Sequence, residues 1–282
     1  MTSNNIISQR EVLNWLNNPD VSFVDGSWYL PSQNRNAKEE YSTARIPGAV
    51  FFDIDAISDP DTDLPHMLPH PEVFAEVAGV LGLSHDKLII VYDGPGLFSA
   101  PRVWWTLKTM GAKNVKILEG GFDNWRTESL PIEKGNPTKT RQTIFQPHFS
   151  RNKVANQSDV ENNIKHEKFI VLDARPNARF KGEAPEPREG MRSGHIPKSL
   201  SLPASDLVKD GKLIATTELN KTFQDLGINT DSEVITTCGS GVTAAILTLA
   251  LHETGRENTK LFDGSWAQWG RPDGPEISTD DK

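Results

Sequence analysis

The sequence predicts an α/β protein of two tandem domains that repeat one another, each a parallel sheet flanked by helices. Three observations support this fold class. The chain has 282 residues, enough for two domains of about 150 residues that each bury a core. Short β-branched runs alternate with longer segments of helical period, which is typical of βαβ units. The second half also repeats the first at an offset of about 144 to 150 residues, which indicates an internal duplication.

Four matched segments define the duplication. The short strand predicted at Val21–Asp25 ends in aspartate, and residues 169–173 repeat it. The strand predicted at Leu88–Tyr92 is matched by residues 233–237. The other two pairs are residues 45–48 with 195–198 and residues 118–121 with 262–265. Because all four pairs keep their order, we expect the two halves to share one fold.

Helices are predicted between the strands, and the two halves join at a polar segment. Ser8 and Ser158 carry side chains preferred at helix N-caps and stand at the start of two of these helices. The predicted helices cover residues 8–17, 71–82, 99–110, 158–166, 217–226 and 242–254. Residues 134–143 have neither helical nor strand period and are predicted to be linker. We expect a first domain at residues 1–136, a linker at 137–157 and a second domain at 158–282.

Composition excludes several function classes. Cys238 is the only cysteine, so the chain cannot form an internal disulfide or a cysteine-rich zinc site. With 30 Lys and Arg against 38 Asp and Glu, the net charge of −8 provides no basic surface for nucleic acid or an anionic membrane. The N-terminal residues lack a secretory signal pattern, and the most apolar helix candidate is far shorter than the roughly 20 residues that span a bilayer. We expect a cytoplasmic protein that binds neither nucleic acid nor membrane.

The candidate for chemistry is the loop Cys-Gly-Ser-Gly-Val-Thr at residues 238–243, between a predicted buried strand and a predicted helix. Sites in open α/β sheets lie beyond the carboxyl ends of strands. Gly239 and Gly241 permit positive φ, so successive N–H groups can turn inward as a nest for an anion, and the helix adds its positive end. Such an environment stabilises a thiolate. The alternative is that Cys238 packs as a small buried hydrophobe and the glycines only turn the chain.

Three further motifs accompany this loop: Asp-Gly-Ser-Trp at 263–266, Phe-Ser-Ala-Pro-Arg-Val-Trp-Trp at 98–105 and His-Met-Leu-Pro at 66–69. In this combination the chain resembles the tandem rhodanese family of sulfurtransferases, and more narrowly its 3-mercaptopyruvate sulfurtransferases. The resemblance covers both halves and implies two rhodanese-like domains, the first non-catalytic and the second catalytic. The first half carries Asp93 where the second carries Cys238, and aspartate cannot act as a sulfur nucleophile. Arg45 and Gln268 depart from the usual rhodanese pattern, and we expect only structural consequences.

The charge of the cysteine loop separates two sulfur donors. Thiosulfate-using relatives typically have Arg and Lys after the cysteine, which suit a dianion, whereas this chain has Gly239 and Ser240. An uncharged loop favours 3-mercaptopyruvate, whose transferred sulfur begins as a thiol. The resemblance further implies that Arg179 and Arg188 bind the carboxylate and carbonyl of this substrate, a task suited to the planar guanidinium fork. The alternative is that both arginines belong to a solvated charged loop.

The resemblance also implies that Ser240, His66 and Asp55 form a hydrogen-bonded set in the active site. Histidine exchanges protons near neutral pH and a carboxylate can fix its tautomer, so these residue types suit acid–base work. The alternative for His66, which lies in a proline-rich segment, is an ordinary surface position. The remaining expected substrate-binding residues are those of the cysteine loop, namely Gly239, Gly241, Val242 and Thr243.

The expected activity is a double displacement. The Cys238 thiolate takes sulfur from 3-mercaptopyruvate, pyruvate leaves, and thioredoxin, a small thiol or cyanide removes the sulfur from the Cys238 persulfide. Nothing in the sequence requires a metal, nucleotide or flavin, so we expect no cofactor. Two alternatives stay open: a thiosulfate:cyanide sulfurtransferase (rhodanese), and a non-catalytic binding module or sulfur carrier that accepts sulfur from another enzyme. A cysteine phosphatase is disfavoured because residues 239–243 lack the arginine that stabilises a transferring phosphoryl group.

Overall fold

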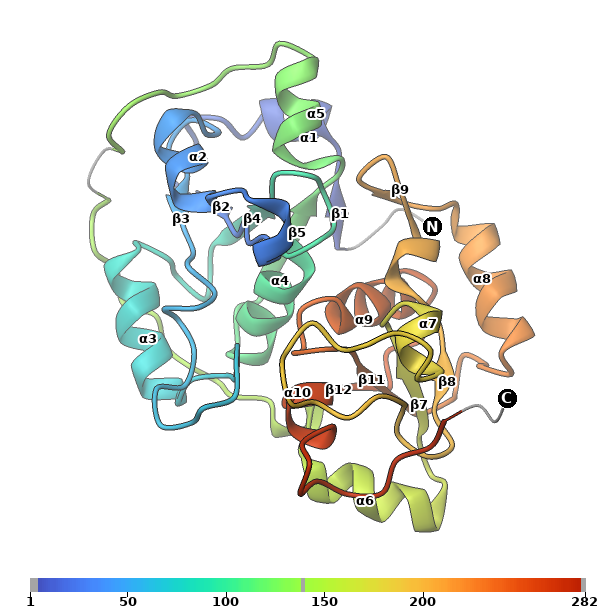
Figure 1. Cartoon of the computed structure of the whole chain (residues 1–282). Helices are drawn as coiled ribbons and strands as arrows, with labels where there is room; N and C mark the ends of the chain where they lie inside the picture. The colour runs from blue at the N-terminus through green and yellow to red at the C-terminus, as the bar shows by residue number, and fades with distance from the viewer. Residues whose placement is uncertain (1–4, 138–139, 280–282) are drawn as a thin grey trace. The chain divides into compact units, whose positions relative to one another are not determined.

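The computed structural model describes residues 5–137 and 140–279, which form two compact units (Figure 1). The first unit contains the chain up to Asp59, Leu68–Ser150 and Asp210–Lys212, and the second contains Pro60–Met67, Arg151–Lys209 and the chain from Leu213. Each unit is built on a five-stranded parallel sheet with helices between the strands, which confirms the predicted α/β class.

The sheet of the first unit has the strand order β1-β5-β4-β2-β3, and its neighbouring strands are parallel. The strands are β1 (Ile6–Ile7), β2 (Val21–Asp25), β3 (Val50–Phe51), β4 (Leu88–Tyr92) and β5 (Asn114–Leu118). Strand β4 reads Leu-Ile-Ile-Val-Tyr and its last four residues are buried. This continuous apolar run is expected of a strand covered on both faces. Because β2 and β4 are parallel neighbours, the chain leaves both at the same edge of the sheet.

The helices of the first unit are mostly short. They are α1 (Gln9–Leu13), α2 (Ala37–Thr43), α3 (Pro71–Val80), α4 (Ala100–Thr109) and α5 (Gly121–Thr127), with a 3-10 turn, η1, at Pro31–Gln33. Ser8 caps α1 as predicted: its hydroxyl accepts from the N–H of Glu11, whose carboxylate accepts from the N–H of Ser8. Helix α4 packs on β4 and β5 and buries most of its residues.

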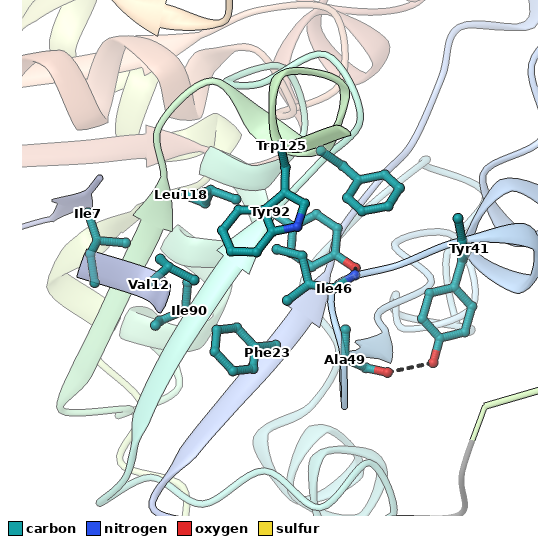
Figure 2. Packing of buried hydrophobic residues seen from close by; sticks show 12 residues of the cluster. Ile7, Val12, Phe23, Tyr41, Ile46, Ala49, Ile90, Tyr92, Leu118 and Trp125 are labelled. Carbon is teal, nitrogen blue, oxygen red and sulfur yellow. Dashed lines mark hydrogen bonds between the residues drawn. The ribbon is translucent and has the colours of Figure 1, made fainter. Parts of the chain in front are cut away.

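One hydrophobic cluster of the first unit reaches both edge strands of its sheet, with Ile7 of β1 inside it and Phe51 of β3 packed against it (Figure 2). Trp125 on α5 is completely buried and packs with Phe23 of β2 and Ile90 of β4. At one side of the cluster the hydroxyl of Tyr41 donates to the carbonyl of Ala49 at 2.7 Å (Figure 2). The cluster therefore fixes the strands whose carboxyl ends carry the loops described below.

Arg45 lies completely buried beside this cluster. Its guanidinium donates to the carbonyl of Gly135 at 2.7 Å and pairs with the side chain of Glu133. In the second unit the matching residue is His195, whose Nδ1–H donates to the carbonyl of Phe180 at 2.9 Å. Arg45 thus ties residues 133–135 to the first unit, and His195 ties the end of α7 to the second, so the departure at Arg45 has a structural role.

The sheet of the second unit repeats the same order as β6-β12-β11-β7-β8. Its strands are β6 (Val154–Ala155), β7 (Ile170–Asp173), β8 (Leu200–Ser201), β11 (Val234–Thr237) and β12 (Thr259–Phe262), and a small hairpin pairs β9 (Val208–Lys209) with β10 (Lys212–Leu213). Strand β11 is buried along its whole length and occupies the centre of the sheet.

The helices of the second unit are α6 (Gln157–His166), α7 (Asn177–Phe180), α8 (Thr216–Asp225), α9 (Ala244–Glu253) and α10 (Ser265–Trp269), with 3-10 turns η2 (Arg151–Lys153) and η3 (Ala204–Asp206). The predicted cap Ser158 is wrong. Asn156 caps α6, because its side chain accepts from the N–H of Asp159 while the Asp159 carboxylate accepts from the N–H of Asn156. Among the described residues, no helix has the length and apolar character needed to cross a membrane.

The compact units differ from the expected domain limits in two respects. Residues 60–67, which precede α3 in the first half of the sequence, group with the second unit, and the hairpin turn at residues 210–212 groups with the first. The expected linker at 137–157 also holds structure, since β6 is an edge strand of the second sheet. Residues 138 and 139 of that linker lie outside the described part of the chain. Two-residue strands have no period, so the sequence offered no signal for β6.

Candidate active site

Cys238 lies where the central strand of the second unit ends. It follows β11 directly, and the loop of residues 239–243 leads from it into α9. The thiol is free and buried, with 2% of the residue exposed. Helix α9 is buried over its first eight residues, so its position against the sheet is fixed and its positive end faces the loop. The structure therefore places the cysteine at the carboxyl edge of a parallel sheet, where α/β proteins bind ligands.

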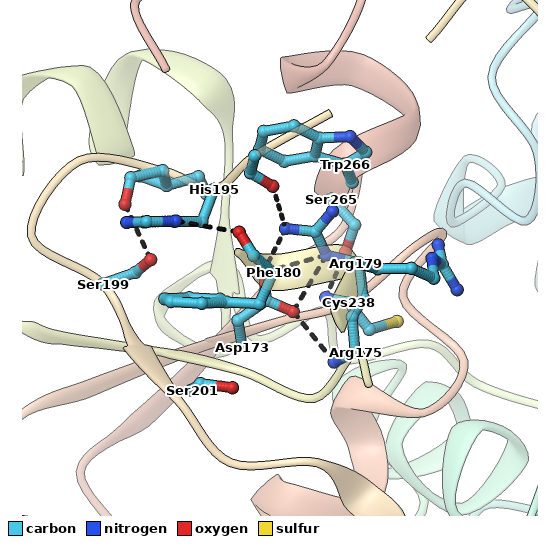
Figure 3. A network of polar contacts seen from close by, with 12 residues as sticks. Asp173, Arg175, Arg179, Phe180, His195, Ser199, Ser201, Cys238, Ser265 and Trp266 are labelled. Atoms are coloured by element: carbon cyan, nitrogen blue, oxygen red, sulfur yellow. Dashed lines mark hydrogen bonds and ion pairs between the residues drawn. The ribbon is translucent and has the colours of Figure 1, made fainter. Parts of the chain in front are cut away.

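Helix α10 anchors the cysteine loop from the other side. The N–H of Cys238 donates to the Ser265 hydroxyl at 3.2 Å, and that hydroxyl donates to the carbonyl of Phe262 at 2.8 Å. The carbonyl of Cys238 accepts from the N–H of Trp266 at 2.9 Å. Figure 3 shows Cys238 and Ser265 side by side, with Trp266 above them. Ser265 was not singled out in the sequence, although it belongs to the Asp-Gly-Ser-Trp motif.

The matching loop of the first unit encloses a carboxylate. Asp93 follows β4 and is completely buried. Its Oδ1 accepts from the N–H of Gly96 at 2.6 Å, and its Oδ2 accepts from the N–H groups of Phe98, Ser99 and Ala100 at 2.7 to 2.8 Å. Burial raises the pKa of Asp93, while these four N–H groups oppose the rise. The loop thus turns four N–H groups toward one anion.

Both loops are built in the same way. Gly96 and Gly241 occupy equivalent positions with φ of 81° and 77°, a conformation that glycine adopts without strain. Equivalent hydrogen bonds also tie the two loops to α5 and α10, respectively. They run from Phe122 N to Asp93 O (2.8 Å), Asp123 N to Gly94 O (2.9 Å), Trp266 N to Cys238 O (2.9 Å) and Ala267 N to Gly239 O (2.8 Å). The second unit therefore has a thiol where the first has a buried carboxylate.

Two guanidinium groups lie beside Gly239. A carbon placed at the Cβ position of this glycine would be 3.4 Å from Nη2 of Arg179 and 3.9 Å from Nη1 of Arg188. Arg179 comes from α7 and its side chain is 21% exposed. In Figure 3 the Arg179 side chain extends to the same side of the network as the Cys238 sulfur. The structure thus brings both predicted arginines to the cysteine loop.

A chain of alternating charges supports Arg179. Arg175 donates from Nη2 to Oδ2 of Asp173 at 2.7 Å and from Nη1 to Oε1 of Glu186 at 2.8 Å. Arg175 also stacks on Trp266, with its guanidinium carbon 4.0 Å from the ring centroid. Burial lowers the pKa of Arg175, but the two carboxylates outweigh burial and the pKa is raised. Glu186 in turn binds Arg179, and neither Arg175 nor Glu186 was selected from the sequence.

The two strand-end aspartates have different partners in the two units. Asp173 at the end of β7 is paired with Arg175, whereas Asp25 at the end of β2 has Ser27 at the matching position. Ser27 donates its backbone N–H to Asp25 at 3.0 Å. Burial raises the pKa of Asp25 to about 7, although hydrogen bonds from Ser27 and Tyr92 act in the opposite direction. The catalytic candidate unit therefore neutralises this buried carboxylate with an arginine, and the other unit does not.

His66 reaches the cysteine loop within the second unit. Its Nδ1 lies 3.0 Å from Oγ of Ser240, and both residues are buried. His66 belongs to residues 60–67 and has φ of 62°, a left-handed conformation that costs energy for a residue with a Cβ. Asp63 of the same segment accepts from Nη2 of Arg271 at 2.7 Å. Two side-chain contacts therefore hold this segment on the second unit.

Asp55, the third member of the expected set, belongs to the first unit. Its Oδ2 accepts from the indole N–H of Trp28 at 3.0 Å. Its participation in the site stays a prediction. Of the other predicted loop residues, Val242 is buried and Thr243 precedes the first residue of α9.

Known proteins share this architecture. The Rhodanese-like domain family matches residues 8–128 and 156–271. The chain is 44% identical to 3-mercaptopyruvate sulfurtransferase of Escherichia coli strain K12, over 90% of this chain and 91% of that protein. It is 40% identical to thiosulfate/3-mercaptopyruvate sulfurtransferase 1, mitochondrial, of Arabidopsis thaliana, over 92% of this chain and 74% of that protein. The crystal structure of SseA from Escherichia coli has a TM-score of 0.85 and 41% identity, over 93% of this chain and 98% of that one. The chain therefore belongs to the tandem rhodanese sulfurtransferases, enzymes with two rhodanese-like domains, and is close to the 3-mercaptopyruvate sulfurtransferases.

Proposed function

We propose that this enzyme transfers sulfur from 3-mercaptopyruvate through a persulfide on Cys238 to a thiol or cyanide, and releases pyruvate. One observation carries the proposal: a buried thiol, in a loop built like the one that encloses Asp93, has the guanidinium groups of Arg179 and Arg188 beside it at Gly239. A substrate with a carboxylate at one end and sulfur at the other fits this arrangement. The arginines bind the carboxylate and carbonyl, and the sulfur meets Cys238.

The first half-reaction exchanges one bond for another. The Cys238 thiolate attacks the thiol sulfur of the donor, an S–S bond forms, and the C–S bond breaks with its electron pair on carbon. The leaving group is the enolate of pyruvate, which takes up a proton as the outer sulfur becomes an anion. The loop N–H groups hold that anion as the equivalent groups of the first unit hold Asp93. An acceptor thiol or cyanide then removes the outer sulfur and restores the thiolate.

Ser240 and His66 manage the proton in this scheme. Ser240 contributes a hydroxyl to the loop, and His66 lies within hydrogen-bond distance of it. The hydroxyl delivers a proton to the enolate and recovers one from the imidazole. Asp55 would orient the imidazole, as the sequence predicts. In this scheme Ser240 and His66 carry out the acid–base chemistry, and the two arginines bind the substrate.

The neutral start of the loop favours 3-mercaptopyruvate over thiosulfate. The side chains of Gly239 and Ser240 carry no charge, so a dianion gains less electrostatic attraction there than it would beside cationic side chains, whereas a thiol needs no such attraction. Thiosulfate is the competing donor because the Arabidopsis relative is named for both. A sulfur carrier that cannot release pyruvate by itself is the other competing function.

Thioredoxin and small thiols are the acceptors that we propose, with cyanide as the assay acceptor. We also propose a cytoplasmic site of action. A free cysteine as the working group suits a reducing compartment.

Mass spectrometry and steady-state kinetics test the proposal together. Purified enzyme mixed with 3-mercaptopyruvate alone should gain one sulfur atom at Cys238 and release one equivalent of pyruvate, and Cys238→Ser should do neither. A carrier would neither gain sulfur nor release pyruvate in this mixture, and would gain sulfur at Cys238 only from the persulfide of another protein. The ratio of kcat/KM for the two donors should favour 3-mercaptopyruvate, and a preference for thiosulfate would overturn the donor assignment.

A further inference from the structure

A buried carboxylate controls the placement of Arg179. Glu186 has a side chain that is only 3% exposed although it lies in a loop rich in charged residues. Its Oε1 accepts from Nε of Arg179 at 3.2 Å, and its Oε2 accepts from Nη2 of the same guanidinium. This two-point contact fixes the plane of the guanidinium as well as its position.

The contact leaves one side of the guanidinium for the substrate. Within the described residues, the hydrogen bonds of Arg179 use Nε and one hydrogen of Nη2. An arginine has five N–H donors, so the two on Nη1 and the second on Nη2 remain for another anion. Nη2 is also the atom beside Gly239. Glu186 therefore holds Nη2 of Arg179, which keeps one unused hydrogen, beside the cysteine loop.

Glu186 is itself held in place by Arg175. The Oε1 atom that binds Arg179 also accepts from Nη1 of Arg175, which is anchored on Asp173 and on the carbonyl of Gly194. Asp173 and Arg175 are each 1% exposed at the side chain. A buried hydrogen-bonded network of this kind is held in a single arrangement. Because it begins at Asp173 of β7, it fixes Arg179 relative to that strand.

The network also sets the local charge. Arg175 and Arg179 carry two positive charges, and Asp173 and Glu186 carry two negative charges, so the four linked side chains sum to zero. Without Glu186 the same group would carry one positive charge more, which favours a dianion such as thiosulfate over a donor with one carboxylate.

We propose that Glu186 is a positioning residue that fixes Arg179 and selects a monoanionic sulfur donor over a dianionic one. The inference rests on the proposed function, because it assigns Arg179 to the donor carboxylate. Nothing in the sequence distinguishes Glu186 from the charged residues around it. The burial and the two-point contact are what single it out.

Two variants of Glu186 separate charge from geometry. Glu186→Gln removes the charge and presents an amide N–H₂ to one of the guanidinium donors, so Arg179 is released. We expect KM for 3-mercaptopyruvate to rise about tenfold, the effect of losing one charge-assisted contact, with a smaller change in kcat. The kcat/KM ratio of thiosulfate to 3-mercaptopyruvate should rise about tenfold as well. Glu186→Asp keeps the charge but shortens the reach, so KM should rise while the donor ratio stays at the wild-type value.

Glu189→Gln is the matched control, because it makes the same charge change on an exposed residue of the same loop. It should leave both KM and the donor ratio unchanged. Equal donor ratios in wild type and Glu186→Gln would overturn the role in selection. An unchanged KM in both Glu186 variants would overturn the role in positioning. Wild-type enzyme that fails to release pyruvate from 3-mercaptopyruvate would instead reject the proposed function, and this is measured first on the unmodified protein.

Discussion

Asp25→Asn should stabilise the first unit above neutral pH. Asp25 ends β2 and is 3% exposed, and the second unit places Arg175 where the first has Ser27. Burial raises the pKa of Asp25 to about 7 from the model-compound value of 3.8. The native state therefore binds this proton more tightly than the unfolded state does. Asparagine keeps the shape and an acceptor for Ser27 but has no charge to bury.

The size of the effect follows from linkage. A rise of about three pKa units corresponds to about 4 kcal/mol. Because the native pKa is the higher one, the contribution of Asp25 to stability is fully present below about pH 4 and is lost as the pH rises to about 7. Asparagine removes this loss but gives up the stronger hydrogen bond from Ser27, which costs about 1 kcal/mol. The net expectation at pH 8 is a gain of about 3 kcal/mol in the free energy of unfolding.

Urea unfolding followed by tryptophan fluorescence measures this gain. Residues 15, 28, 104, 105 and 125 are tryptophans of the first unit, so the signal reports mainly on it. Wild type and Asp25→Asn should differ by about 3 kcal/mol at pH 8 and by much less at pH 5. Asp20→Asn, whose side chain is 81% exposed, is the control and should not change the pH dependence. A variant that is less stable than wild type at pH 8 would refute the reasoning.

Three further predictions concern the second unit. Ser240→Ala should lower kcat for 3-mercaptopyruvate by about 100-fold, the lower range for loss of a positioned proton donor. Adding His66→Ala should lower kcat little further, because the two groups act together. If the two losses multiply in the double variant, the groups act separately. Gly241→Ala and Gly227→Ala should each lower the free energy of unfolding by about 1 to 2 kcal/mol, because both glycines have positive φ. Only Gly241→Ala should also lower kcat, and equal kcat values in the two variants would mean that the loop conformation does not matter to the reaction. Arg188→Ala should raise KM for 3-mercaptopyruvate about tenfold or more, and an unchanged KM would place the carboxylate elsewhere.

The sequence predicted the long elements well and the short ones poorly. Strands β2 and β4 have the predicted limits, because β4 is an uninterrupted apolar run and β2 is a short apolar segment, broken by Ser22, that ends in Asp25. Helix α1 ends at Leu13, and residues 14–17, which the sequence predicts to be helical, form turns that end at Asn17 with φ of 66°. Helices of four to seven residues, such as α7 and α10, carry too few turns for a hydrophobic period to be recognised.

The candidate site, too, could be predicted only in part from the sequence. Cys238 and its glycines could be found because a strand, a turn and a helix are adjacent in sequence. The contact of His66 with Ser240 could not be derived from local patterns, because it depends on where residues 60–67 pack. Glu186 has the same charge as its neighbours Glu183 and Glu189, and only the fold distinguishes a buried carboxylate from an exposed one.

The assignment of residues 60–67 to the second unit limits how this duplicated protein can be divided. A fragment that begins at Arg151 would contain Cys238, Arg179 and Arg188, but not His66. The same fragment would lose Asp63, the partner of Arg271. Domain shuffling at the junction of the repeats would therefore separate Cys238 from His66, which contacts Ser240 of the same loop. The half that lacks a thiol supplies residues 60–67 to the second unit, so only the whole tandem contains every residue of the proposed site.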